Sequence, residues 1–210
     1  PNGSGKSTLL RIAAGIMPPD SGTVLYQEQD IYVRSIWYKY RLGYLPQNFS
    51  FYSHMTGMNY LLYLANLKGI FGKCAKQRAL YAADLLDISA HCNKKISTWS
   101  VGLRQRLGIA QVLLNDPDVL ILDEPFYSLA FEESCRIKEL IYKLARHKIV
   151  LMSTHLIDDI FPASLSLLIN GTLCFSGPPD AFIEQAAGYA WSAAVSREYW
   201  SNIQKTYPDS

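Results

Sequence analysis

The chain opens with Pro1-Asn2-Gly3-Ser4-Gly5-Lys6-Ser7-Thr8, which matches the end of the phosphate-binding pattern G-x-x-x-x-G-K-[ST]. Glycines let backbone N–H groups turn toward phosphate oxygens, and a helix that begins near Lys6 directs the positive end of its dipole to the same place. A Gly/Ser-rich turn before a helix is the alternative, and the adjacent Lys-Ser-Thr argues against it. We therefore expect a bound nucleoside triphosphate, with Asn2, Gly3, Ser4, Gly5, Lys6, Ser7 and Thr8 as its binding residues.

Two of these side chains have specific chemistry. Lys6 supplies a positive charge for the β- and γ-phosphates, and the Ser7 hydroxyl is a ligand for Mg²⁺. A loop of this kind normally follows a buried strand, yet here it begins at residue 1. We therefore expect the first strand of the core to precede Pro1, so that the sequence is an N-terminally truncated domain.

An acidic pair ends a second apolar segment, Val119–Pro125 (VLILDEP). An apolar strand that ends in Asp123 places a carboxylate near the metal, and Glu124 would turn toward the γ-phosphate and polarise an attacking water. The alternative is a strand that ends in two solvated acids. The presence of the phosphate loop in the same chain favours the first interpretation.

The order of apolar patterns predicts an α/β fold with a mostly parallel sheet. Strands are expected at 23–26, 42–45, 119–122 and 149–152, and helical spacing covers 5–16, Thr56 to about Leu86, and 131–147. Ser100 is a candidate N-cap for a helix that carries Leu103 and Leu114. Asn170-Gly171 lies between two apolar segments in 165–175 and predicts a hairpin.

Composition excludes some classes of protein. Of the 210 residues 49% are hydrophobic and 18% charged, and the net charge of +2 comes from scattered Lys and Arg, which argues against a nucleic-acid partner. The four cysteines are far apart, so reduced thiols in the cytosol are expected. No apolar run approaches the length of about 20 residues that a membrane-spanning helix needs.

Three further motifs follow in a fixed order: Gln47 in Gly43–Gln47 (GYLPQ), Ser100–Leu107 (SVGLRQRL) and His155 in Ser153–His155 (STH). Together with the loop and the acidic pair, they resemble the Q-loop, the signature helix and the switch histidine of ABC transporter ATP-binding subunits. The resemblance covers nearly the whole chain. It implies one ATP-binding domain over 1–210, with a P-loop NTPase core, an inserted helical subdomain at about 50–105 that carries the signature, and a C-terminal extension from about 176.

The resemblance also implies roles for particular residues and a reaction. ATP and Mg²⁺ are the expected cofactors, with Ser7, Gln47 and Asp123 at the metal and with Glu124, His155 and Gln47 as catalytic residues. In such proteins two ATP-binding domains pair head to tail. Ser100 and Gly102 would then contact the nucleotide of the other subunit.

The expected partners are an integral-membrane permease and a second ATP-binding subunit, identical or different. The chain would lie at the cytoplasmic face of the cell membrane, attached through the permease, with 49–67 receiving the permease. Family resemblance alone favours export, and the permease selects the substrate.

Two positions depart from the family pattern. Val101 stands where the family commonly has a glycine, which could take a positive φ. Ala130 stands where an aspartate usually closes the loop after the Walker B motif, the name in this family for the apolar strand that ends in Asp123 and Glu124. An unequal pair of subunits is one interpretation of these departures, and sequence drift in a little-used transporter is another. A nucleotide-binding regulatory subunit with little turnover is the alternative function.

Overall fold

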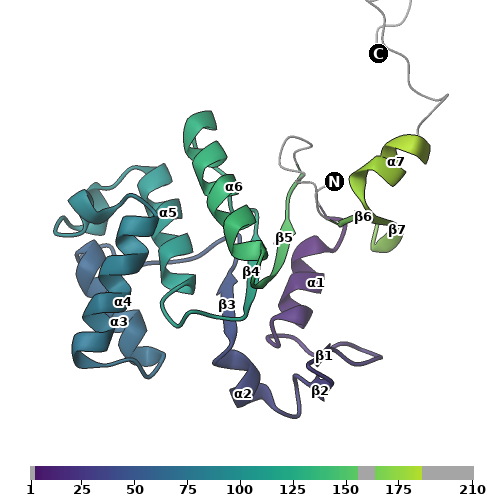
Figure 1. Cartoon of the computed structure of the whole chain (residues 1–210), viewed down its shortest axis with the longest axis horizontal. Helices are drawn as coiled ribbons and strands as arrows, with labels where there is room; N and C mark the ends of the chain where they lie inside the picture. The colour runs from purple at the N-terminus through teal and green to yellow at the C-terminus, as the bar shows by residue number, and fades with distance from the viewer. Residues whose placement is uncertain (1–2, 156–163, 186–210) are drawn as a thin grey trace, which may run out of the picture.

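A three-stranded parallel sheet forms the centre of the structure (Figure 1). The computed structural model describes residues 3–155 and 164–185. The strands lie in the order β3 (Leu42–Leu45), β4 (Val119–Asp123), β5 (Ile149–Ser153). Their register pairs Leu45 with Leu122 and Asp123 with Ser153. The carboxyl ends of all three strands therefore meet at one edge, and the predicted α/β fold is confirmed.

Helices cover both faces of the central strand, which explains its uninterrupted apolar sequence. Leu120 and Leu122 belong to a core cluster with residues of α5 (Val101–Val112) and α6 (Phe131–Ala145). Val119 and Ile121 belong to a second cluster, with Leu10 of α1 (Lys6–Ala13). Alternate residues of β4 thus pack against helices on opposite faces.

The helical region differs from the single helical stretch expected from Thr56 to about Leu86. It contains α3 (Gly57–Leu67) and α4 (Gly72–Leu85). Gly69 ends α3 at φ 79°, and Ile70 N donates back to the Ala65 carbonyl at 2.9 Å. Such a left-handed glycine closes a helix, and the apolar periodicity continues across it. No described helix has the length and apolar character to cross a membrane.

Two hairpins complete the β structure. Strands β6 (Leu165–Ile169) and β7 (Thr172–Gly177) pair antiparallel around Asn170 and Gly171, at φ 49° and 79°, which confirms the predicted hairpin. The first strand is shorter than expected, because β1 (Leu25–Tyr26) turns at once into β2 (Gln29–Asp30). The sequence did not predict α2 (Ser35–Lys39), α7 (Pro179–Gln185) or the short 3₁₀ turns η1 (Ser89–His91) and η2 (Ile96–Thr98).

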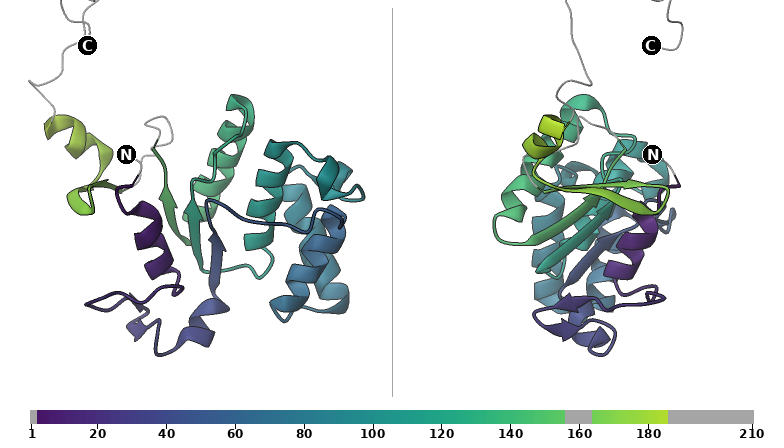
Figure 2. Two further views of the ribbon diagram at one scale, coloured as in Figure 1. Left: turned by 180° about the vertical axis from the view of Figure 1, so that it is seen from behind. Right: turned by 90° about the vertical axis from the view of Figure 1, so that its right-hand side faces the viewer.

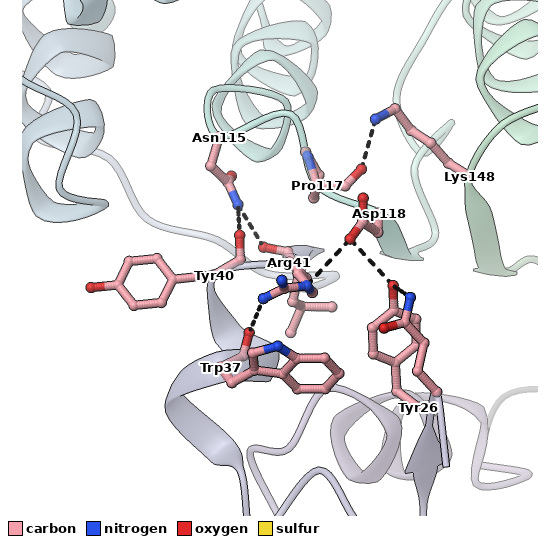
Figure 3. A network of polar contacts seen from close by, with 10 residues as sticks. Tyr26, Trp37, Tyr40, Arg41, Asn115, Pro117, Asp118 and Lys148 are labelled. Atoms are coloured by element: carbon pink, nitrogen blue, oxygen red, sulfur yellow. Dashed lines mark hydrogen bonds and ion pairs between the residues drawn. The ribbon is translucent and has the colours of Figure 1, made fainter. Parts of the chain in front are cut away.

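A polar network joins the loops at the amino ends of the parallel strands (Figure 3). Asp118 precedes β4, accepts a hydrogen bond from Tyr26 Oη at 3.2 Å and lies 3.6 Å from Arg41 Nε. Asn115 Nδ2 donates to the Tyr40 carbonyl at 2.9 Å. These contacts fix the entry of β3 and β4, at the edge of the sheet opposite to their carboxyl ends.

Asp116→Asn is expected to lower the free energy of unfolding by about 0.5–1 kcal/mol at pH 7. Asn tolerates the left-handed φ of 49° at this position but lacks the charge that lies 2.7 Å from Lys148 Nζ. The Lys148 hydrogen bond lowers the pKa of the Asp116 carboxyl from 3.8. Because the pKa is lowered in the folded state, the ionised Asp116 carboxylate stabilises the folded protein at pH values above the unfolded-state pKa. This stabilisation is lost as the pH falls through the folded-state pKa.

Urea unfolding of both proteins at pH 7 and at pH values below 3.8 checks this expectation. The difference between the two proteins shrinks in acid. An equal difference at every pH would contradict it.

Candidate functional site

The phosphate loop has the backbone geometry that its glycines predict. Gly3 and Gly5 adopt φ values of 75° and 94°, which residues with a side chain rarely adopt. Gly5 is the N-cap of α1 and has no side chain to occupy the first N–H groups of the helix. A helix start of this kind binds anions through its N–H groups and its dipole. Asn2, also expected at this site, lies outside the described residues.

The structure brings four predicted parts of the site to one edge of the sheet. Gln47 follows β3, Glu124 follows β4 and His155 follows β5, and the parallel register places these strand ends side by side. Helix α1 begins at the edge where β5 ends (Figure 1, Figure 2). The side chain of Gln47 is exposed there.

Ser153 connects the two acids at the end of β4. Asp123 is 1% exposed, and its Oδ1 accepts a hydrogen bond from Ser153 Oγ at 2.5 Å. The Glu124 N–H donates to Ser153 Oγ at 3.0 Å and lies 3.2 Å from the Ser153 carbonyl oxygen. The orientation of both acids therefore depends on the end of β5.

Glu124 pairs with the expected switch histidine. His155 Nδ1 lies 2.9 Å from Glu124 Oε2 and 3.0 Å from Oε1. The contact requires a proton on Nδ1 when Glu124 is ionised. Glu124 is 7% exposed and adopts φ 52°. A buried carboxylate that is oriented by a histidine is suited to act on a water molecule.

The donor atoms at this edge fit Mg²⁺. Asp123 offers a carboxylate, Ser7 a hydroxyl at the start of α1 and Gln47 an amide oxygen, all hard oxygen ligands. Residues 3–155 and 164–185 contain no group of three or more His, Cys, Asp and Glu placed to bind a metal. A Mg²⁺ ion at this site would therefore also need phosphate oxygens and water, which is how Mg²⁺ is commonly bound.

The signature residues lie apart from this cluster. Ser100 caps α5, and its Oγ accepts from the Leu103 N–H at 3.2 Å, as predicted. Helix α5 lies on the far side of α6 from α1 (Figure 1, Figure 2). Within one chain, therefore, Ser100 and Gly102 do not reach the phosphate loop.

The concern that Val101 would need a positive φ is not supported. Val101 is the first residue of α5, is absent from the residues with positive φ and is 60% exposed. At Gly102 a Cβ would lie 2.8 Å from Glu133 Oε2, the end of a flexible side chain that would have to move aside. At the second departure, Ala130 is the N-cap of α6 and provides no side-chain acceptor.

Sequence reasoning assigned no role to two polar residues at the site. Ser153 belongs to the quoted STH motif, and a hydroxyl residue at the end of a strand beside the Asp123 strand was an available signal. Gln105 belongs to the signature helix, is 8% exposed and donates to the Pro125 carbonyl at 2.9 Å. Nothing in the local sequence indicates this contact, since the two residues are 20 positions apart.

Known proteins share this sequence and fold. The family model described as ABC transporter matches residues 1–127. The ABC transporter ATP-binding protein YxlF of Bacillus subtilis, named as uncharacterized, is 34% identical over 94% of this chain and 66% of its own length. The Escherichia coli protein YbhF, named as a probable multidrug ABC transporter ATP-binding protein, is 31% identical over 90% of this chain and 33% of its own length.

A solved structure agrees with these matches. A dimeric post-hydrolysis state of the ATP-binding cassette MJ0796 with ADP and Pi is 26% identical, covers 85% of this chain and 82% of its own, and has a TM-score of 0.75. The chain spans no more than about two thirds of the length of the two relatives above. The matched family model covers more than half of the chain, and with the phosphate loop, the acidic pair and the histidine at one sheet edge it shows that this chain belongs to the ABC transporter family of ATP-binding proteins.

Proposed function

We propose that this chain binds Mg-ATP and hydrolyses it to drive a separate membrane permease. The observation that carries the proposal is the cluster of Asp123, Glu124 and His155 at the sheet edge where α1 begins. A phosphate loop alone would support nucleotide binding. A buried carboxylate beside a histidine adds a group that can act on the attacking water.

Each residue of the site has a separate role in the proposed hydrolysis of ATP. Lys6 and the first N–H groups of α1 bind the phosphates, and Ser7 and Asp123 would hold Mg²⁺, which neutralises the charge of the β- and γ-phosphates. Glu124 orients the attacking water and receives its proton. His155, hydrogen-bonded to Glu124, orients that carboxylate and lies where it can approach the γ-phosphate.

The site needs a second subunit. Ser100 and Gly102 cannot reach the phosphate loop of their own chain, so we propose that they bind the nucleotide of a partner across a head-to-tail dimer. The similar MJ0796 cassette, whose solved structure is dimeric, supports this arrangement. The partner is a second copy or a different ATP-binding subunit.

A surface on 49–67 supports the permease partner. Tyr52, Tyr63 and Leu67 are 50%, 38% and 67% exposed, and the rings of Tyr52 and Tyr63 meet edge-on at 5.6 Å. Phe49 and Met58 in the same segment pack instead against the core. We therefore assign only the exposed part of this segment to the permease, at the cytoplasmic face of the membrane. We propose export, which the family resemblance and the multidrug name of YbhF support.

A regulatory subunit with little turnover is the second candidate, favoured by Val101 and Ala130. Ala130 lacks the carboxylate that usually follows Walker B, and Val101 adds an exposed side chain where a partner's nucleotide would approach. Glu124 and His155, by contrast, keep the contact that the enzyme needs. The two candidate functions, ATPase and regulatory subunit, therefore differ in whether the altered residues at 101 and 130 still allow turnover in the dimer.

Turnover of Mg-ATP by the full-length protein is expected to rise faster than linearly with protein concentration. Two chains are needed for each site, so the specific activity increases as the dimer forms. The measurement is phosphate release at concentrations that span the dimerisation range, together with ATP binding.

The double variant Val101→Gly, Ala130→Asp is the informative comparison. If it hydrolyses ATP and the natural chain only binds it, the regulatory candidate is correct. If both proteins hydrolyse ATP equally, with turnover that depends on concentration, the result supports the proposal that the natural chain is an ATPase. Turnover that is independent of concentration would contradict the shared site.

A further inference from the structure

A buried side-chain amide connects the signature helix to the residue that follows Glu124. Gln105 lies on α5 and is 8% exposed, and its Nε2 donates to the carbonyl oxygen of Pro125 at 2.9 Å. Pro125 is buried as well. Because water has little access to either group, it cannot readily replace this hydrogen bond. A movement of α5 is therefore transmitted to the Glu124–Pro125 peptide, or it breaks the bond.

The backbone of Glu124 makes this connection important. Its φ of 52° is unfavourable for a residue with a side chain, and such conformations persist only where the surroundings fix them. On the amino side, the Glu124 N–H is bound by Ser153 of β5. On the carboxyl side, the ring of Pro125 fixes its own φ, and Gln105 fixes the direction of its carbonyl group.

A second contact of α5 does not serve the same purpose. Arg106 Nη2 lies 3.2 Å from Glu133 Oε1, on α6. That ion pair joins two helices and does not involve the backbone of Glu124 or Pro125. Gln105 is thus placed to connect the helix that binds a partner's nucleotide with the residue that acts on water.

We propose that Gln105 is a positioning residue that makes the orientation of the Glu124 carboxylate depend on the position of α5. Nucleotide bound at the start of α5 fixes the helix, and the Gln105–Pro125 hydrogen bond then fixes Glu124. Each subunit thereby couples occupancy of its signature helix to its own catalytic carboxylate. This inference rests on the proposed function, because it requires that Glu124 act in hydrolysis.

Gln105→Met tests the inference, since Met is similar in length and cannot donate a hydrogen bond. We expect kcat for ATP hydrolysis to fall about 10-fold or more, while KM for ATP changes less than about twofold. Gln105→Asn, which keeps an amide but shortens its reach, should show the same pattern and serves if the Met variant does not fold. A residue with a purely structural role would lower the amount of folded protein without changing kcat per folded molecule.

Gln111→Met is the matched control. Gln111 lies on the same helix, and its Oε1 accepts from Tyr60 Oη at 3.1 Å, away from the loop after β4. Its kcat should stay within about twofold of the natural protein. Equal losses of kcat in the Gln105 and Gln111 variants would overturn the inference.

Glu124→Gln separates this inference from the proposed function. If the natural protein hydrolyses ATP and Glu124→Gln does not, an unchanged kcat in both Gln105 variants overturns only the role of Gln105. No hydrolysis by the natural protein in a complete dimer would overturn both. The expected result is loss of kcat in the Gln105 and Glu124 variants with KM retained.

Discussion

Replacing Glu124 by Gln is expected to lower kcat for ATP hydrolysis by about 10²-fold or more. The amide has nearly the shape of the carboxylate but cannot accept a proton from water. ATP affinity should change less than about twofold, because the phosphate-binding groups lie on the loop and α1. Phosphate release under saturating Mg-ATP and equilibrium binding of labelled ATP are the two measurements.

Glu132→Gln provides the matched control for this substitution. Glu132 lies in the first turn of α6 and is exposed, so the same chemical change there removes a charge without touching the site. Its kcat should equal that of the natural protein. If Glu124→Gln retains full turnover, the carboxylate next to His155 is not the group that acts on water.

Much of the core could be predicted because the sequence of each buried strand is itself a recognisable pattern. The runs 42–45 and 119–122 are short, apolar and bounded by turns, as strands covered on both faces must be. Asp123 and Glu124 end such a run, so their position at a sheet edge follows from the pattern. The strand order β3-β4-β5 then places Gln47 and His155 at the same edge.

The parts that could not be predicted depend on contacts between distant residues. The hydrophobic periodicity of the sequence continues across Gly69, so it does not predict the break between α3 and α4. The break is visible only in the structure, where Gly69 adopts a left-handed φ. Likewise, Ser153 and Gln105 act through backbone groups 29 and 20 positions away. No local pattern specifies which carbonyl or N–H a buried polar side chain will meet.

The separation of Ser100 from the phosphate loop follows from the same topology. Helices α5 and α6 share one face of β4, whereas α1 packs on the other. The start of the signature helix and the start of α1 thus lie on different sides of the sheet within one chain. This separation is the reason for proposing that a second chain completes the site.

Gly43→Ala is expected to lower the free energy of unfolding by about 3 kcal/mol. Gly43 lies in β3, paired with Leu120, and a Cβ there would be 2.6 Å from the backbone carbonyl oxygen of Val112 on α5. Leu120 Cδ2 and Pro117 Cγ would each lie at 3.0 Å. A backbone carbonyl cannot rotate away, so α5 must shift from the sheet. The unfolding midpoint in urea measures the loss.

Gly108→Ala on α5 is the comparison that isolates the backbone contact. A Cβ at Gly108 would also be too close to its neighbours, with three ring atoms of Phe49 within 2.8 Å. Phe49 is a half-buried side chain that can turn aside, and Ala favours a helix over Gly by about 1 kcal/mol. Gly108→Ala should therefore cost less than about 1.5 kcal/mol. Equal losses at Gly43 and Gly108 would mean that the approach of α5 to β3 does not limit the residue at position 43.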